Sequence, residues 1–121
     1  MKRKSGDERR QHARCRARVP YRLVWSGGAL TGWTKNLSIS GALLNHDRVP
    51  EDFEEKAELE EITLYLDLDD EKITAKCRTI RAQNLVLSGS TIAVHYNSFL
   101  SNEVEEKYLD YVNEKLSRAR R

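Results

Sequence analysis

The 121-residue sequence has few of the residues that form disulfides or hold metals, with two cysteines and three histidines. Cys15 and Cys77 are too few for a disulfide framework, although they allow one bridge, and they favour a reducing compartment. No apolar run approaches the roughly 20 residues that span a bilayer. The charged start is not followed by the apolar segment of a secretory signal. We therefore expect a cytoplasmic protein that does not insert into a membrane.

Signatures of catalysis and metal binding are also scarce. The histidines, His12, His46 and His95, are scattered, and no serine lies in a nucleophile-elbow context. No Walker-type or dinucleotide glycine pattern occurs. His12 and Cys15 have a spacing that metal ligands use, but one such pair without a second does not define a metal site. We expect no enzyme activity, no metal site and no cofactor.

Charge is nearly balanced in total but segregated along the chain. The 21 lysines and arginines nearly cancel the 19 aspartates and glutamates, which excludes a uniformly basic nucleic-acid coat. Residues 1–22 carry nine basic and two acidic side chains, a local charge of +7, whereas residues 51–72 carry two and eleven, a local charge of −9. Residues 1–14 are almost devoid of apolar side chains, so we expect a flexible, arginine-rich arm before a domain of residues 15–121.

From residue 15 onward the apolar residues follow a period of two. Through 15–25 they alternate with arginines, which predicts a half-buried strand, and Pro20 points to an edge position or a bulge. The acidic stretch 47–61 is interpreted as an exposed connection. Strands are expected at 15–25, 29–37, 41–44, 62–68, 73–80 and 92–96. Six strands with short polar turns predict an all-β domain, either a small barrel or a sandwich.

The end of the chain changes to a helical period, which predicts one helix over about 101–117. Asn102, with Glu105 three residues later, is the predicted N-cap. We expect the apolar face to pack on the open side of the barrel, with docking of a partner as the alternative. The predicted apolar stripe consists of Val104, Tyr108, Tyr111, Val112 and Leu116.

Two polar clusters remain to be explained. One is an arginine block that includes Arg9, Arg10 and Arg14. Guanidinium groups match phosphate and the O6/N7 edge of guanine, although a solvated basic arm is the alternative reading. The other is Asn36-Leu-Ser-Ile-Ser-Gly41, between two predicted strands. Its asparagine and serines can bond a ligand, and its glycine permits a positive φ in a sharp turn, but an ordinary turn has the same composition.

Together these clusters resemble the PilZ family of bacterial cyclic di-GMP receptors. That family carries R-x-x-x-R in an N-terminal arm and [D/N]-x-S-x-x-G after the first two strands, and here Arg10 to Arg14 and Asn36 to Gly41 match the two motifs. The spacing between the motifs selects this arginine pair over the other arginine registers. The resemblance covers essentially the whole chain and departs mildly at Ala93-Val-His-Tyr96, where the family has Gly-hydrophobic-x-Phe at positions interpreted as packing positions.

The resemblance implies a six-stranded antiparallel β-barrel with a flexible N-terminal arm and one C-terminal helix. It also implies that cyclic di-GMP is clamped between the arm and the turn formed by residues 36–41. The arginines would bond phosphates and guanine edges, the polar turn residues would hold a guanine or orient the arginines, and the glycine would keep the turn geometry. The implied ligand-binding residues are Arg9 (as an auxiliary contact), Arg10, Arg14, Asn36, Ser38 and Gly41.

A binding module without catalytic groups acts through a downstream protein partner or its own oligomer, and the resemblance therefore implies a receptor that signals by ordering its arm. Two alternatives stay open. A basic nucleic-acid-binding barrel would need aromatic side chains among the arginines, and Tyr21 and Trp25 fall on the predicted buried face, which disfavours nucleic acid. A PilZ-like interaction scaffold without nucleotide binding is disfavoured because both motifs are intact.

Overall fold

The computed structural model describes residues 14–47, 49–50, 53, 57, 60–69, 71–85 and 89–119, with the backbone alone for 81–85, 89 and 119. Arg9, Arg10 and most of the predicted arm lie outside the described residues. Within the described part the chain forms strands followed by a helix. They are β1 (Cys15–Arg16), β2 (Pro20–Trp25), β3 (Gly28–Leu37), β4 (Gly41–His46), β5 (Ile62–Leu68), β6 (Glu71–Leu85), β7 (Gly89–Phe99) and α3 (Asn102–Ala119).

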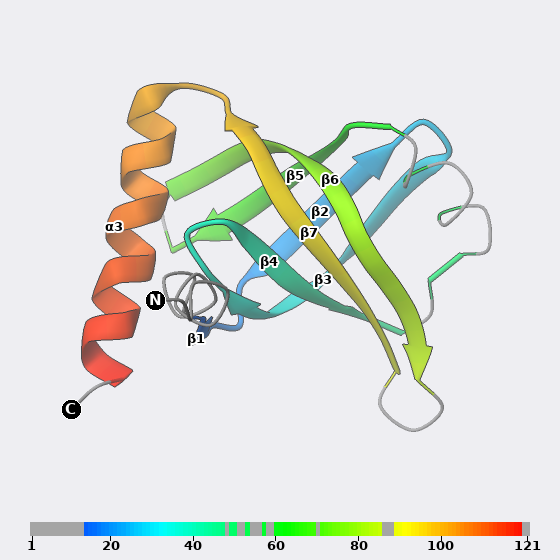
Figure 1. The fold of residues 1–121 in the computed structure, drawn as a ribbon, viewed down its shortest axis with the longest axis horizontal. Helices are drawn as coiled ribbons and strands as arrows, with labels where there is room; N and C mark the ends of the chain where they lie inside the picture. The colour runs from blue at the N-terminus through cyan, green and yellow to red at the C-terminus, as the bar shows by residue number, and fades with distance from the viewer. Residues whose placement is uncertain are drawn as a thin grey trace, which may run out of the picture.

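The strands close into a six-stranded antiparallel barrel (Figure 1). Around the barrel the order is β3, β2, β5, β6, β7 and β4, and β4 pairs with β3 to complete the circle. The two-residue β1 pairs with the last two residues of β3, beyond the segment that pairs with β2. This closure decides between the barrel and the sandwich that the strand pattern left open, because a closed sheet has no long unpaired edge.

The first predicted strand is broken into β1 and β2, yet its period of two persists across the break. Odd-numbered residues from Cys15 to Trp25 are all buried, as predicted. The hydroxyl of Thr34 bridges the break: it accepts a 2.9 Å hydrogen bond from the Val19 N–H and donates to the Ala17 carbonyl. Pro20 therefore opens β2, in agreement with the expected irregularity.

The acidic connection after β4 is anchored in the core, which corrects its interpretation as an exposed loop. Val49, Phe53 and Ala57 are buried, the last two completely. The Phe53 ring meets that of Trp25 edge to face, with centroids 5.0 Å apart. These apolar residues recur every four positions, which is a helical spacing. The many carboxylates between them instead favoured the prediction of an exposed loop.

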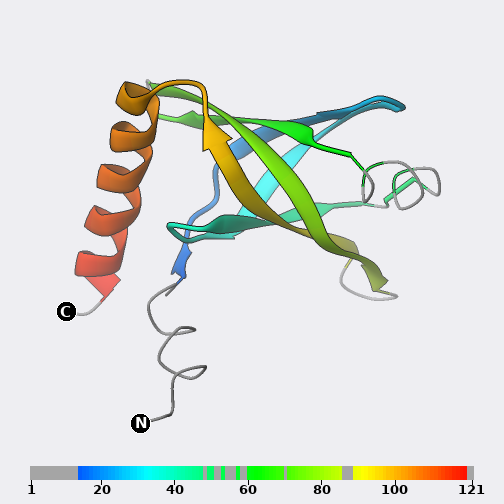
Figure 2. The same cartoon turned by 45° about the horizontal axis from the view of Figure 1, so that its top comes forward.

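Helix α3 lies across the end of the barrel near β1 (Figures 1 and 2) and contacts β1, β6 and β7. Tyr108 and Val112 of the predicted stripe are completely buried, which confirms its packing role. The predicted cap is one residue too late, because the Ser101 hydroxyl accepts the Val104 N–H at 3.2 Å. Among the described residues, no helix combines the length and hydropathy needed to cross a bilayer.

Candidate functional site

The Asn36–Gly41 turn connects β3 to β4, and the side chain of Ser38 braces it from within. The Ser38 N–H donates to the Gly41 carbonyl at 2.9 Å. The Ser38 hydroxyl accepts the N–H groups of Ser40 and Gly41 at 3.3 and 3.2 Å. Since Ser38 is only 5% exposed, its hydroxyl is committed to the shape of the turn.

Asn36 reaches the outside of the barrel because the strand is irregular at this point. The register of β3 against β4 shifts between Thr34 and Asn36. Thr34 and Leu37 both face the core, so two residues between them share the outer side. A bulge of this kind re-aims a side chain without ending the strand, and here it leaves Asn36 half-buried beside the turn.

Gly41 is required for space rather than for an unusual backbone angle, which corrects the reason expected from the sequence. Among the described glycines, the one with a positive φ is Gly28. A Cβ on Gly41 would overlap the carbonyl oxygen of Val94 and lie 3.3 Å from the Cα of His95. The absence of a side chain therefore allows β4 and β7 to approach each other at the turn.

A pair of buried tyrosines holds the turn from the core side. The Tyr108 hydroxyl donates to the Ser38 carbonyl at 2.6 Å and accepts a hydrogen bond from the Tyr96 hydroxyl at 2.7 Å. The Tyr96 N–H donates to the Ser40 carbonyl at 2.9 Å. Burial raises the pKa of both tyrosines, so both hydroxyls keep their protons and the chain of hydrogen bonds persists at neutral pH.

A small hollow of about 50 Å³ opens on the outer side of the turn. It brings together Arg14, at the start of the described chain, with three predicted site residues of the turn. Strands β6 and β7 supply the opposite wall. The lining residues are Arg14, Asn36, Ser38, Ser40, Gly41, Ala42, Ile80, Ala93, Val94 and His95.

Two residues that line this hollow each have a buried polar atom without a hydrogen-bond partner among the described residues: Asn36 Oδ1 and His95 Nδ1. An unsatisfied buried polar atom costs roughly 1–3 kcal/mol, which a ligand with matching groups would relieve. Beside them Ile80 is 58% exposed and Arg14 carries an exposed positive charge. The hollow therefore suits a planar ligand that combines N–H donors, an apolar face and an anionic group.

His95 and Ile80 were missed by the sequence interpretation. His95 alternates with buried Val94 and Tyr96, so it faces outward, which differs from the packing role that the sequence predicts for this position. The available signal was the period of two in β7, which turns Ala93 and His95 to the outside. The pairing of the strands decides which of these outward-facing residues lie next to the Asn36–Gly41 turn. The period of two does not show how the strands pair.

Comparison with known proteins gives one consistent family. A sequence model of the PilZ domain matches residues 8–114. No curated protein matches the chain. Among solved structures, the Bacillus subtilis inhibitor of motility, MotI/DgrA, superposes with a TM-score of 0.71 at 16% identity, over 92% of this chain. This chain spans 53%, about half, of that protein.

Two further structures extend the match. The PilZ domain of CeSA from a cellulose-synthesizing bacterium is 23% identical, with a TM-score of 0.61 over 84% of this chain and 96% of that one. The PilZ domain of YcgR from Escherichia coli, solved with c-di-GMP, is 16% identical, with a TM-score of 0.61 over 93% of this chain and 95% of that one. At these identities the structures establish a shared fold.

Proposed function

The chain belongs to the PilZ domain family, and on that basis we propose that it is a receptor for cyclic di-GMP rather than an enzyme. The observation that supports this most directly is the convergence of Arg14, Asn36, Ser38 and Gly41 on one hollow. These residues come from both motifs of the family, which are separated along the chain by β1, β2 and most of β3. The nucleotide offers guanine N–H donors, planar rings and two phosphates, which are the features that the hollow suits.

We assign different roles to the residues of the turn. Asn36 Oδ1, unpartnered among the described residues, would accept a guanine N–H, and the Arg14 guanidinium would bind a phosphate or the O6/N7 edge of guanine. Ser38 would act through the turn geometry, because its hydroxyl is already used there. Arg9 and Arg10, outside the described residues, would complete the grip from the arm.

The signalling step in this proposal is a change of surface. Closure of the arm over the nucleotide would present a different surface to a downstream protein partner or to a second copy of the chain. Ordering the arm would reduce the net free energy of binding. Affinity near the micromolar range, about −8 kcal/mol, is therefore expected. We place the protein in the cytoplasm, where such a receptor would meet a nucleotide second messenger.

Isothermal titration with cyclic di-GMP tests the proposal. We expect Arg14→Ala to lose about 2–5 kcal/mol of binding free energy, because it would leave a phosphate or guanine edge unpaired. Arg22→Ala is the matched control, since Arg22 is also exposed but does not line the hollow. Equal affinity of the wild type and Arg14→Ala would refute the assignment, and the absence of any binding by the wild type would refute the proposed function.

A further inference from the structure

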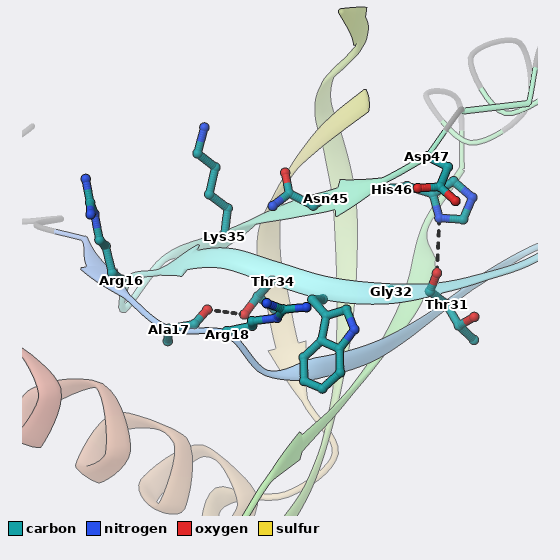
Figure 3. A pocket seen from close by; sticks show the side chains of 11 residues that line it. Arg16, Ala17, Arg18, Thr31, Gly32, Thr34, Lys35, Asn45, His46 and Asp47 are labelled. Atoms are coloured by element: carbon teal, nitrogen blue, oxygen red, sulfur yellow. Dashed lines mark hydrogen bonds between the residues drawn. The ribbon is translucent and has the colours of Figure 1, made fainter. Parts of the chain in front are cut away.

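A second and larger hollow lies on the outer face of β1, β3 and β4 (Figure 3), with a volume of about 840 Å³. It shares no lining residue with the hollow at the Asn36–Gly41 turn. We call it the Trp33 groove. Its lining residues are Arg16, Ala17, Arg18, Thr31, Gly32, Trp33, Thr34, Lys35, Asn45, His46 and Asp47.

One part of the Trp33 groove is cationic. Arg16, Arg18 and Lys35 are exposed, and none of them forms an ion pair with a described carboxylate. Figure 3 shows Arg16 at one end of the groove and Lys35 between it and Asn45. Because no described carboxylate pairs with these three side chains, an anionic group could bind them without first breaking a salt bridge within the described part of the chain.

The opposite end of the groove carries hydrogen-bond acceptors. His46 and Asp47 lie there, away from Arg16 (Figure 3), whereas Asn45 lies nearer the middle, paired with Trp33 across the β3–β4 ladder. His46 Nδ1 is 3.0 Å from the Thr31 carbonyl, and because a carbonyl oxygen can only accept, this ring nitrogen donates. A ligand along the groove thus meets positive charge at one end and acceptors, including a carboxylate, at the other.

Between the two ends lies an exposed aromatic ring. Trp33 is 45% exposed, whereas Trp25 is 7% exposed. The Arg18 guanidinium lies over the Trp33 ring, 4.7 Å from its centroid. An indole among arginines is the arrangement on which nucleobases stack. The prediction that Tyr21 and Trp25 are buried is confirmed, but Trp33 supplies an exposed aromatic ring beside the arginines.

We propose that the Trp33 groove binds a phosphate-bearing nucleobase, independently of the site at the Asn36–Gly41 turn. The phosphate lies against Arg16 and Lys35, and the base stacks on the Trp33–Arg18 pair. The exocyclic amine of the base points toward the acceptors at the far end. Such a group comes either from a free nucleotide or from a single-stranded nucleic acid, and the volume falls within the roughly 300–1,000 Å³ of ligand sites.

The layout of the groove argues against an acidic peptide as its occupant. A peptide rich in carboxylates would pair with the cationic end, but Asp47 would repel it at the other end. It would also leave the exposed indole without a planar partner. A nucleobase with an attached phosphate matches the cationic end, the ring and the acceptor end in that order.

Tryptophan fluorescence tests the proposal in every protein that keeps Trp33, because ligand stacking quenches this exposed ring while buried Trp25 remains as a reference; isothermal titration measures binding by Trp33→Leu, which lacks the reporter. The probes are GMP and a fluorescein-labelled single strand of about 12 nucleotides, within the span that small barrels cover. We expect Trp33→Leu to weaken binding about tenfold or more. Arg16→Gln and Lys35→Gln should each weaken it several-fold and flatten its salt dependence. Arg22→Gln, a matched arginine outside the groove, should bind as the wild type does.

Binding of GMP supports a free nucleotide as the source, and binding of the strand alone supports nucleic acid. The proposal is overturned if neither probe binds, if Trp33→Leu with a native circular dichroism spectrum binds as the wild type does, or if polyglutamate displaces the probe better than GMP. Cyclic di-GMP titration separates the two sites: Trp33→Leu should retain cyclic di-GMP affinity, and Arg14→Ala should retain the groove ligand. Loss of cyclic di-GMP binding in Trp33→Leu would overturn the independence of the groove.

Discussion

The hydroxyl of Tyr108 in helix α3 donates a 2.6 Å hydrogen bond to the carbonyl oxygen of Ser38 in the Asn36–Gly41 turn. The two residues are 70 positions apart, and Tyr108 is completely buried. The same hydroxyl accepts from Tyr96, so helix, last strand and turn share one hydrogen-bonded chain. The hydrogen bond therefore ties the turn directly to α3, which packs behind the proposed binding site.

Tyr108→Phe removes this link while it preserves the ring. It leaves the Ser38 carbonyl and the Tyr96 hydroxyl without their partner in a buried place, and we expect a loss of about 1–3 kcal/mol in the free energy of unfolding. Cyclic di-GMP affinity should fall as well, because the turn loses its support. Urea denaturation and isothermal titration measure the two effects. Tyr111→Phe, on the same helix but half-buried, should change neither; equal behaviour of the two variants would contradict the role given to Tyr108.

The sequence predicted the parts of the fold that depend on local pattern. The period of two assigned the buried faces of β2 and β5, and the helical stripe assigned Tyr108 and Val112 to the core. The turn residues could be grouped because they follow one another along the chain. The burial of Phe53 could not be predicted, because the charged residues around it indicate an exposed loop and the apolar pattern in this stretch is short.

Other features depend on which strands become neighbours. His95 and Ile80 reach the hollow only because β7 pairs with both β4 and β6. Periodicity fixes the face of a residue but not its neighbour across the sheet. The exposure of Trp33 could not be predicted either, because the sequence does not show which face of β3 points toward the core. The burial of Thr34 places Trp33 on the outer face. The close approach at Gly41 also required the pairing of β4 with β7 to be known.

The bridge that Thr34 makes across the β1–β2 break predicts a contrast between two conservative substitutions. Thr34→Val keeps the shape but leaves the Val19 N–H and the Ala17 carbonyl without this partner, at a cost of about 1–3 kcal/mol. Thr34→Ser keeps the hydroxyl and should cost less. Because the bridge also fixes the segment that carries Arg14, Thr34→Val should weaken cyclic di-GMP binding more than Thr34→Ser. Matching urea midpoints for the two variants would contradict the bridge.

Gly41→Ala should be among the most harmful substitutions of the turn. Its Cβ would overlap the Val94 carbonyl oxygen, and a backbone atom of a paired strand has little freedom to move. We expect a loss of about 1–3 kcal/mol, typical of overpacking in a rigid place, together with loss of cyclic di-GMP binding. Ser40→Ala, in the same turn, is the control and should stay within about 1 kcal/mol of the wild type. Thermal unfolding in which Gly41→Ala matches this control would show that β4 and β7 can separate freely.

Stability should fall at alkaline pH. Burial raises the pKa of the Cys77 thiol from 9.0 to about 12 and also raises the pKa of Tyr96 and Tyr108. A group whose pKa is higher in the folded than in the unfolded chain stabilises the fold fully when the pH is below its pKa in the unfolded chain. This contribution is lost as the pH rises through its pKa in the folded chain. The Cys77 thiol between about pH 9 and 12, and each buried tyrosine above about pH 10, should lower the free energy of unfolding by up to about 1.4 kcal/mol per pH unit.

Urea denaturation across this range measures the alkaline decline. Cys77→Ala should make it shallower just above pH 9, where the tyrosines, with an ordinary pKa of 10.0, contribute less. The free thiols Cys15 and Cys77 should also react slowly with Ellman's reagent until the protein unfolds, because both are buried. An unchanged alkaline profile in Cys77→Ala would mean that this thiol is not protected by the fold.

Asn36 and Ser38 allow stability and binding to be separated within one turn. Asn36 Oδ1 is buried and unpartnered among the described residues, so Asn36→Ala should leave the free energy of unfolding unchanged or raise it by up to about 1 kcal/mol. The same change should weaken cyclic di-GMP binding about tenfold or more, because the guanine loses its acceptor. Asn36→Asp, which keeps an acceptor and the family motif, should retain binding. Ser38→Ala should lose both stability and affinity, since its hydroxyl braces the turn. If Asn36→Ala were destabilised like Ser38→Ala and still bound the nucleotide, Asn36 would be a structural residue, and the acceptor in the hollow would have to be found elsewhere, with His95 the next to test.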